Sequence, residues 1–328
     1  LPAGALPDQL EVLWKFPAKD AIDGAPAVAD GLVFVGSEDE HLYAVDPTTG
    51  VKKWEYKAGP VKASPAWHDG AIYVGDSNGV FHCVDREGHK RWTFPTGAEI
   101  TSGANFAGDD VLFGSYDETL YCLHKDGKPA WSFKTSGPVN GSAAVVGDRT
   151  FVAGCDSVLH ILDVQKGVEL KSVDLGGQAA ATAAVYGDKL YVGTMADEVH
   201  EVDWKKAEPG WTFRAAKRAE PFFSSAAVTD AIVVVGGRDR RVRGLDRKMG
   251  NEAWSFATEG NIDSSPVVVG DRVYAGSLDG KLYVLDLTKG TEVTHYDLDG
   301  AVTGSPAVAD GRLFIGTEKG TLYCFGKK

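Results

Sequence analysis

The chain has 328 residues, of which 43% are apolar and 24% are charged, and this composition excludes a disordered or collagen-like chain. With 46 acidic against 34 basic residues, the net charge of −12 disfavours nucleic acid or an anionic membrane surface as a partner. No apolar stretch approaches the roughly 18 residues that a transmembrane helix requires. The chain begins at Leu1 rather than Met, which fits either removal of a targeting segment or a shortened chain.

One motif recurs eight times along the chain, with a mean period of 40 residues. Each copy has a start of small residues, a turn with Asp or Gly, an apolar run that closes on Gly, and a second apolar run that usually ends in Asp. The copies start at Ala25, Ser64, Gly103, Ser142, Thr182, Ser225, Ser265 and Ser305. A fixed period of this length is typical of solenoids and propellers.

The first copy predicts four strands joined by three hairpins, over residues 26–29, 32–37, 41–46 and 51–58. Residues 42–45 are apolar at successive positions, so both faces of such a strand must be covered by neighbouring sheets. The sequence therefore predicts an all-β fold, an eight-bladed β-propeller of four-stranded antiparallel blades. We expect a single domain over residues 1–328, and a monomer.

The two ends of the chain predict how the ring closes. The eighth copy ends after Cys324 and lacks a fourth strand, whereas residues 11–17 read as an extra strand before the first copy. Pairing this strand with the last one would complete blade eight and remove an exposed edge.

Tryptophan marks the fourth strand of most copies. Trp14, Trp54, Trp92, Trp131, Trp211 and Trp254 share one register, and Lys171 and Thr294 stand at the matching place in copies four and seven. Because each indole can bury roughly 150 to 250 Å², we interpret the six as structural residues that dock one blade against the next. Blades four and seven are then the weaker docking points.

Three further sets of repeated residues look like sites but have structural explanations. Asp46, Asp85, Asp163, Asp203, Asp246 and Asp286 precede turn glycines, and we expect their carboxylates to bind turn amides. Cys83, Cys122 and Cys324 share a third-strand register and read as buried small side chains. The histidines at 82, 160 and 200 lie one to a blade, so they cannot converge on a metal, and we predict no metal site.

Residues 46–54 (DPTTGVKKW) and 246–254 (DRKMGNEAW), with the apolar runs before them, resemble the tryptophan-docking repeat of pyrroloquinoline-quinone-type propellers. This family includes quinoprotein dehydrogenases, outer-membrane assembly factors of the BamB type, and extracytoplasmic sensor or kinase-linked domains. The chain is most similar to the compact, non-catalytic BamB-like members. That resemblance implies a periplasmic or secreted scaffold that binds a protein or peptide and carries no cofactor.

The alternative is a quinoprotein-type enzyme or sensor that binds pyrroloquinoline quinone or a metal. Members with that activity typically carry long insertions between blades, a tryptophan floor, calcium ligands and often a disulfide between adjacent cysteines. This chain is almost entirely blades and has no adjacent cysteines, and only Trp67 and Trp204 lie outside the docking register. No catalytic residue can be assigned from the resemblance.

Two candidate sites follow from propeller geometry, in which the inter-blade linkers and the turns between second and third strands share one face. The linker between copies five and six is the longest, and basic and aromatic residues gather around it, a composition typical of binding hot spots. The partner-binding candidates are Arg214, Lys217, Arg218, Phe222, Phe223, Arg238, Arg240 and Arg241. For a small ligand, the channel-mouth candidates are Asp23, Lys62, Thr101, Asn140, Asp263 and Thr303.

Overall fold

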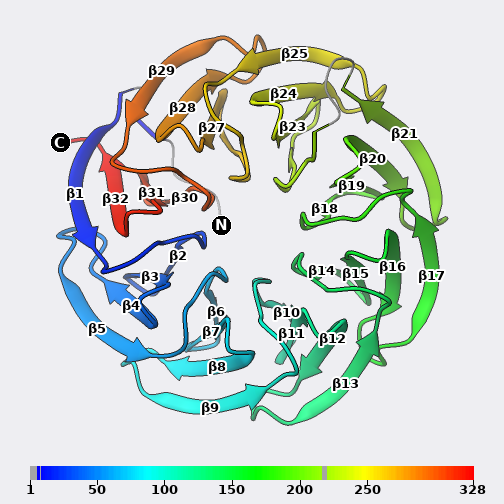
Figure 1. Ribbon diagram of the computed structural model, residues 1–328, viewed down its shortest axis with the longest axis horizontal. Coiled ribbons are helices and arrows are strands. Elements are labelled where there is room, and N and C mark those ends of the chain that lie inside the picture. Colours follow the sequence, from blue (N-terminus) through cyan, green and yellow to red (C-terminus); the bar gives the residue numbers. More distant parts are fainter. Residues whose placement is uncertain (1–5, 8, 216–219) are drawn as a thin grey trace.

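The computed structural model describes residues 6–7, 9–215 and 220–328, and this part of the chain contains strands and no helix. The strands form eight four-stranded antiparallel sheets, arranged as the blades of a ring around a central axis (Figure 1). We number the blades in chain order, so that β2–β5 form blade 1. The predicted eight-bladed propeller is therefore confirmed.

In blades 1 to 7 the strands follow chain order from the axis to the rim, and in blade 8 the outermost strand is the N-terminal β1. The innermost strands are β2 (Ala27–Ala29), β6 (Ala66–His68), β10 (Asn105–Ala107), β14 (Ala144–Val146), β18 (Ala184–Tyr186), β22 (Ala227–Val228), β26 (Val267–Val269) and β30 (Ala307–Ala309). The second strands are β3 (Leu32–Ser37), β7 (Ala71–Gly75), β11 (Asp110–Ser115), β15 (Arg149–Ala153), β19 (Lys189–Gly193), β23 (Ile232–Gly237), β27 (Arg272–Gly276) and β31 (Arg312–Gly316). The third strands are β4 (His41–Val45), β8 (Val80–Asp85), β12 (Thr119–Leu123), β16 (Val158–Asp163), β20 (Glu198–Asp203), β24 (Arg241–Asp246), β28 (Lys281–Asp286) and β32 (Thr321–Gly326). The outer strands are β5 (Lys52–Lys57), β9 (Lys90–Pro95), β13 (Pro129–Lys134), β17 (Glu169–Asp174), β21 (Glu208–Arg214), β25 (Glu252–Ala257), β29 (Glu292–Asp297) and, in blade 8, β1 (Glu11–Pro17).

The N-terminal strand closes the ring, as predicted. β1 pairs antiparallel with β32, from Glu11 opposite Gly326 to Pro17 opposite Thr321. Because the first and last strands share one sheet, blade 8 ties both ends of the ring together.

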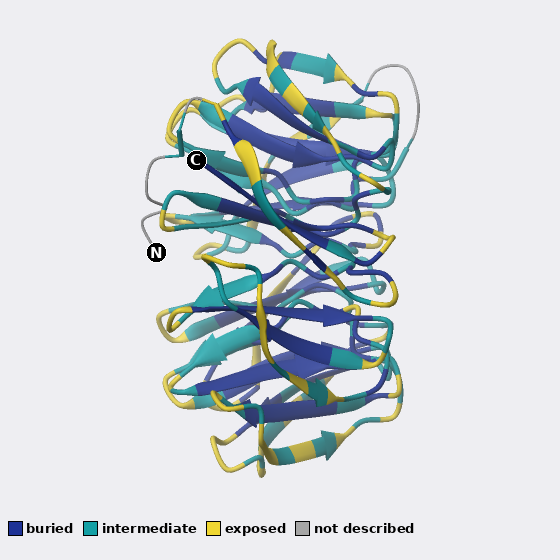
Figure 2. Cartoon of the chain, turned by 90° about the vertical axis from the view of Figure 1, so that its left-hand side faces the viewer, coloured by how far each residue is buried: buried dark blue, intermediate teal, exposed yellow. Residues whose placement is uncertain are grey.

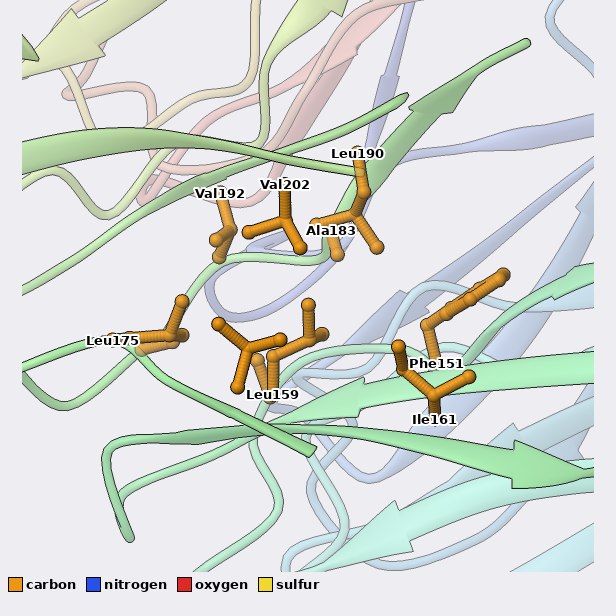
Figure 3. Packing of buried hydrophobic residues seen from close by; sticks show 11 residues of the cluster. Phe151, Leu159, Ile161, Leu175, Ala183, Leu190, Val192 and Val202 are labelled. Atoms are coloured by element: carbon orange, nitrogen blue, oxygen red, sulfur yellow. The ribbon is translucent and has the colours of Figure 1, made fainter. Parts of the chain in front are cut away.

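The core lies between blades, where the second and third strands are buried on both faces (Figure 2). Between blades 4 and 5, Phe151, Leu159 and Ile161 of one sheet face Leu190 and Val202 of the next (Figure 3). The outer strands alternate exposed and half-buried positions, because they cover the core on one side and meet water on the other.

The innermost strands are linked by a hydrogen-bond series that the sequence motif did not reveal. At the start of six of the eight copies, the main-chain N–H donates to the hydroxyl of the residue at the same position in the next blade, at 2.9–3.0 Å. The accepting hydroxyls belong to Ser64, Ser142, Thr182, Ser225, Ser265 and Ser305. One residue earlier the strands crowd together, since a Cβ added at Gly24 would lie 2.7 Å from the carbonyl oxygen of Ala63.

The six docking tryptophans bridge neighbouring blades. Each indole Nε1 donates to a main-chain carbonyl in the outer turn of the next blade, at 2.7–3.0 Å. These bonds join Trp14 to Pro47, Trp54 to Arg86, Trp92 to Lys125, Trp131 to Val164, Trp211 to Arg247 and Trp254 to Leu287. Each ring also lies against a glycine of that turn. A Cβ added at Gly88, for example, would lie 2.8 Å from Cδ2 of Trp54.

The interface between blades 4 and 5 replaces both members of this tryptophan–glycine pair. Lys171 takes the place of the indole and donates from Nζ to the carbonyls of Lys205 and Lys206, at 3.1 and 2.9 Å. Ala207 takes the place of the glycine, with φ of 59°. Because no indole presses on this turn, a methyl group is tolerated where the other turns need glycine.

The predicted roles of the aspartate and cysteine sets are also confirmed. All six aspartates accept hydrogen bonds from turn amides through Oδ1, as Asp46 does from Thr48 and Thr49, at 2.9 and 3.0 Å. The three third-strand cysteines are fully buried. Burial raises the pKa of the Cys83 thiol to about 11 and those of Cys122 and Cys324 to about 12, so these thiols stay protonated and unreactive.

Candidate functional site

The structure joins the two candidate sites at blades 6 and 7. Arg238, which follows β23, binds Asp263 in the next linker through two hydrogen bonds, Nε to Oδ1 at 2.9 Å and Nη2 to Oδ2 at 2.7 Å. Its guanidinium also lies 3.8 Å from the centre of the Phe223 ring. One partner-binding candidate is thus already paired with a channel-mouth candidate, and neither charge is free to bind a ligand on its own.

Phe222 is a core residue, which corrects its prediction as an exposed aromatic. It is 1% exposed and packs with Tyr191 and Val233 between blades 5 and 6. Its register explains the burial, because it lies against Gly193 as Val61 lies against Gly36. The signal was present in the sequence, as an apolar residue precedes each channel-mouth position: Ile22, Val61, Ile100, Val139, Ala179, Phe222, Ile262 and Val302.

Two of the other basic candidates, Arg214 and Arg241, also have partners within the chain. Arg214 pairs with Glu198, with Nη2 2.6 Å from Oε1, and Arg241 donates from Nη1 to the hydroxyl of Ser255 at 3.1 Å. Lys217 and Arg218 lie outside the described residues.

Arg240 differs from these residues, because its guanidinium has no hydrogen bond or ion pair within the described part of the chain. It occupies the left-handed turn between β23 and β24, with φ of 61°. Glu40 and Glu118 hold the same turn position in blades 1 and 3, where each pairs with a lysine of the outer strand, Lys57 and Lys134. In blade 6 the corresponding outer residue is Ala257, which lies opposite Arg241 as Lys57 lies opposite His41.

A cavity of about 350 Å³ lies beside Arg240. It is lined by Asp239, Arg240, Arg241, Ala257, Thr258 and Glu259. Both acids of the lining are already paired. Asp239 binds the buried Arg243, with Nη1 2.9 Å from Oδ1, and Glu259 binds Lys281 at 2.9 Å. The charge of Arg240 therefore remains unbalanced beside a cavity large enough for an acidic side chain.

On the opposite side of the channel mouth, blade 1 carries acidic residues. The Thr303 hydroxyl donates to Oδ1 of Asp23 at 2.8 Å. A hydrogen bond with Asp23, together with burial, raises the pKa of Glu38, while the nearby charge of Lys62 acts in the opposite direction. The acids and the lysine of this part of the mouth therefore interact chiefly with one another.

The uncharged channel-mouth candidates lie between these two regions. The Nδ2 of Asn140 donates to Sγ of Cys155 at 3.4 Å, and Thr101 is hydrogen bonded to the Tyr116 side chain. Within residues 6–7, 9–215 and 220–328, no three His, Cys, Asp or Glu side chains are grouped so that they could hold a metal ion.

The mouth does not fit the tryptophan-floored site that the quinoprotein alternative requires. Trp67 stacks on Phe34 between blades 1 and 2, with ring centres 5.5 Å apart. Trp204 lies in the outer turn of blade 5, and its ring packs against that of Phe151 with ring centres 5.3 Å apart. Both tryptophans thus serve contacts between blades.

A model of one protein family matches almost the whole chain, over residues 8–93, 77–183 and 156–328. Its description is outer membrane protein assembly factor BamB. The chain belongs to the BamB family. Among the described residues, no helix is long and apolar enough to cross a membrane. The comparison with curated proteins found no match.

Solved structures support the same architecture for this BamB-family chain. BamB from Moraxella catarrhalis is 18% identical, with a TM-score of 0.84 and 98% of both chains covered. The computationally designed Ika8 protein is also 18% identical, with a TM-score of 0.84, and the match covers 96% of this chain and 99% of that one. Quinohemoprotein alcohol dehydrogenase from Comamonas testosteroni is 13% identical, with a TM-score of 0.82, and covers 98% of this chain and 77% of its own. At these identities the likeness shows the fold alone.

Proposed function

We propose that this protein is a non-catalytic scaffold, periplasmic or secreted, that binds a protein partner through the linker face of blades 5 and 6. Membership of the BamB family supports a protein partner and an extracytoplasmic location. The observation that carries the proposal is Arg240, whose counterpart residues in blades 1 and 3 are ion-paired within the chain. An acidic side chain of the partner would enter the cavity beside Arg240 and supply the missing charge.

The turn position of Arg240 has a left-handed backbone conformation. Glycine holds the same turn position in blades 2, 7 and 8, with φ of 79°, 82° and 78° at Gly79, Gly280 and Gly320. A side chain in this conformation costs about 1 kcal/mol more than glycine. Side chains hold this position in the other five blades, at Glu40, Glu118, Ser157, Asp197 and Arg240. Arg240 is the only cation among these five, so its charge beside the cavity, rather than its backbone conformation, points to a partner.

The test compares capture of proteins from an extracytoplasmic extract by the wild type, Arg240→Glu, Arg240→Gly and Lys248→Glu. Lys248 is exposed in the outer turn of the same blade, at the opposite end of the strands, so its reversal matches the change in net charge. We expect the extract to contain a protein that binds the wild type and Lys248→Glu equally well. Both Arg240 variants should bind that partner at least about tenfold more weakly, since a lost charged contact at an interface costs roughly 2 kcal/mol or more.

Arg240→Gly also separates binding from stability, because glycine suits the turn and should not lower the melting temperature. A partner captured equally well by all four proteins would refute the role of Arg240. Elution by a glutamate-containing peptide, but not by its glutamine analogue, would identify the carboxylate as the group recognised.

A further inference from the structure

The missing tryptophan of blade 4 leaves a cavity of about 520 Å³ on the outer rim between blades 4 and 5. It is lined by Asp148, Arg149, Ile161, Leu170, Lys171, Trp204 and Lys205. Asp148 lies in the turn between β14 and β15, Arg149 begins β15, and Trp204 and Lys205 come from the turn between β20 and β21. Both turns lie at the end of the strands opposite to the linkers, so this cavity is separate from the one beside Arg240.

The walls of this cavity offer aromatic and aliphatic surface. In blades 1 and 5, the docking tryptophan packs on a second-strand aromatic of its own blade, as Trp54 does on Phe34 with ring centres 5.9 Å apart. Phe151 holds that second-strand place in blade 4, where Trp204 approaches it from the following blade instead. Leu170, which is 44% exposed, adds aliphatic surface to the cavity. The cavity thus lies where other interfaces hold an indole.

Lys171 adds an unbalanced positive charge. An ammonium group has three N–H donors, and two of them are directed at the carbonyls of Lys205 and Lys206. Within the described residues, no carboxylate lies within 4.0 Å of its Nζ. The other two cations of the lining are already paired, Arg149 with Asp148 at 2.7 Å and Lys205 with Asp188 at 2.6 Å. One donor of Lys171 therefore remains for an anion.

We propose that this cavity binds a small aromatic carboxylate. Its ring would lie between Trp204 and Leu170, and its carboxylate would accept the third hydrogen bond of Lys171. The volume lies within the range of about 300–1,000 Å³ that is usual for small-molecule sites. This site involves neither the protein partner nor the linker face, so its test is independent of the test of the proposed function.

The test is an NMR titration of the full chain with indole-3-acetate, following the indole N–H signal of Trp204. That signal is assigned by its loss in Trp204→Phe. Indole and tryptamine serve as neutral and cationic probes of the same ring. We expect indole-3-acetate to shift the Trp204 signal with saturation, indole to bind more weakly, and tryptamine to leave the signal unmoved.

Lys171→Glu tests the charge, with Lys166→Glu as its control. Lys166 is exposed in the outer turn of the same blade and is not in the cavity lining, so both variants change the net charge equally. We expect Lys171→Glu to weaken binding of indole-3-acetate at least tenfold and Lys166→Glu to weaken it less than twofold. No saturable shift at millimolar probe, equal binding of tryptamine, or equal effects of the two variants would overturn the proposal.

Discussion

The interface between blades 1 and 2 and the interface between blades 4 and 5 use the same strand register but different side chains. In the first, Trp54 lies on Gly88 and donates to the carbonyl of Arg86, while the hydroxyl of Tyr56 meets Nδ1 of His82 at 3.1 Å. The contact therefore combines apolar burial with two cross-blade hydrogen bonds.

In the second interface, Lys171 stands in the place of Trp54, Ala207 in the place of Gly88, and Val173 in the place of Tyr56. Since Val173 has no hydroxyl, Nδ1 of His200 is instead hydrogen bonded to Oγ1 of Thr212 in its own blade, at 3.1 Å. The comparison shows that docking residues change as a set, because each one shapes the space that its neighbour fills.

The largest expected effect is the loss of a docking indole. We expect Trp54→Ala to lower the free energy of unfolding by about 2 to 3 kcal/mol, toward the lower end for a large aromatic because the ring is only half-buried. Lys171→Ala should cost less than about 1 kcal/mol, since its two hydrogen bonds are at the exposed rim. Urea denaturation followed by circular dichroism measures both. Equal losses would show that the tryptophan adds nothing to docking.

The turn glycine should be nearly as sensitive. Gly88→Ala places a Cβ against the Trp54 ring at a φ of 91°, and we expect a loss of about 2 to 3 kcal/mol from strain and overpacking together. Gly31→Ala is the matched control, because Gly31 has a φ of 73° but nothing within 4 Å of the added Cβ. It should lose only about 1 kcal/mol. The same denaturation experiment compares them, and similar losses would assign the whole effect to the backbone.

Converting the interface between blades 4 and 5 into the tryptophan–glycine type tests whether the tryptophan and the glycine act together. We expect Lys171→Trp to stabilise the protein only when combined with Ala207→Gly, because the methyl group of Ala207 occupies the place where an indole would lie. The double-mutant cycle should give a coupling of about 1 to 2 kcal/mol. Additive effects would mean that the tryptophan–glycine pairing has no energetic basis.

Hydrogen exchange can compare the stability of the two kinds of blade interface without mutation. We expect amides near the interfaces of blades 4 and 7 with the following blades to exchange roughly tenfold faster than those beside docked tryptophans, through local opening. Mass spectrometry of peptides covering β17 and β29, compared with β5 and β9, would detect this. Uniform protection around the ring would contradict it.

The smallest effect concerns pH, and it follows from the changed surroundings of His200. Burial lowers the pKa of His200, and this effect outweighs the opposite one of Glu198, whose Oε2 lies 3.3 Å from Nε2 of the histidine. The unfolded chain, with a histidine pKa of about 6.5, therefore takes up the proton first, so stability should fall as the pH drops below that value. Melting temperatures between pH 7.5 and 5.5 should fall less steeply in His200→Gln than in the wild type. Parallel curves would exclude His200 as the cause.

Much of the fold could be predicted because its signals repeat. The period, the closing strand and the docking register of Trp54 and its counterparts were each visible, since every blade encodes its own strands and turns locally. The candidate site was harder to predict from the sequence. Arg240 stood among eight basic and aromatic candidates, and only the opposing Ala257 and the pairing of its neighbours distinguished it.

The repeats alone specify the number of blades, their order, the ring closure and the places where docking is altered, because strand pairing within a blade is local. The tertiary structure decided which charges are balanced and which aromatics are exposed. Arg238 meets Asp263, Phe222 is buried against Gly193, and Trp204 reaches back to Phe151. Each of these contacts joins residues on adjacent blades, and the spacing between adjacent blades depends on side-chain packing around the whole ring rather than on any single repeat.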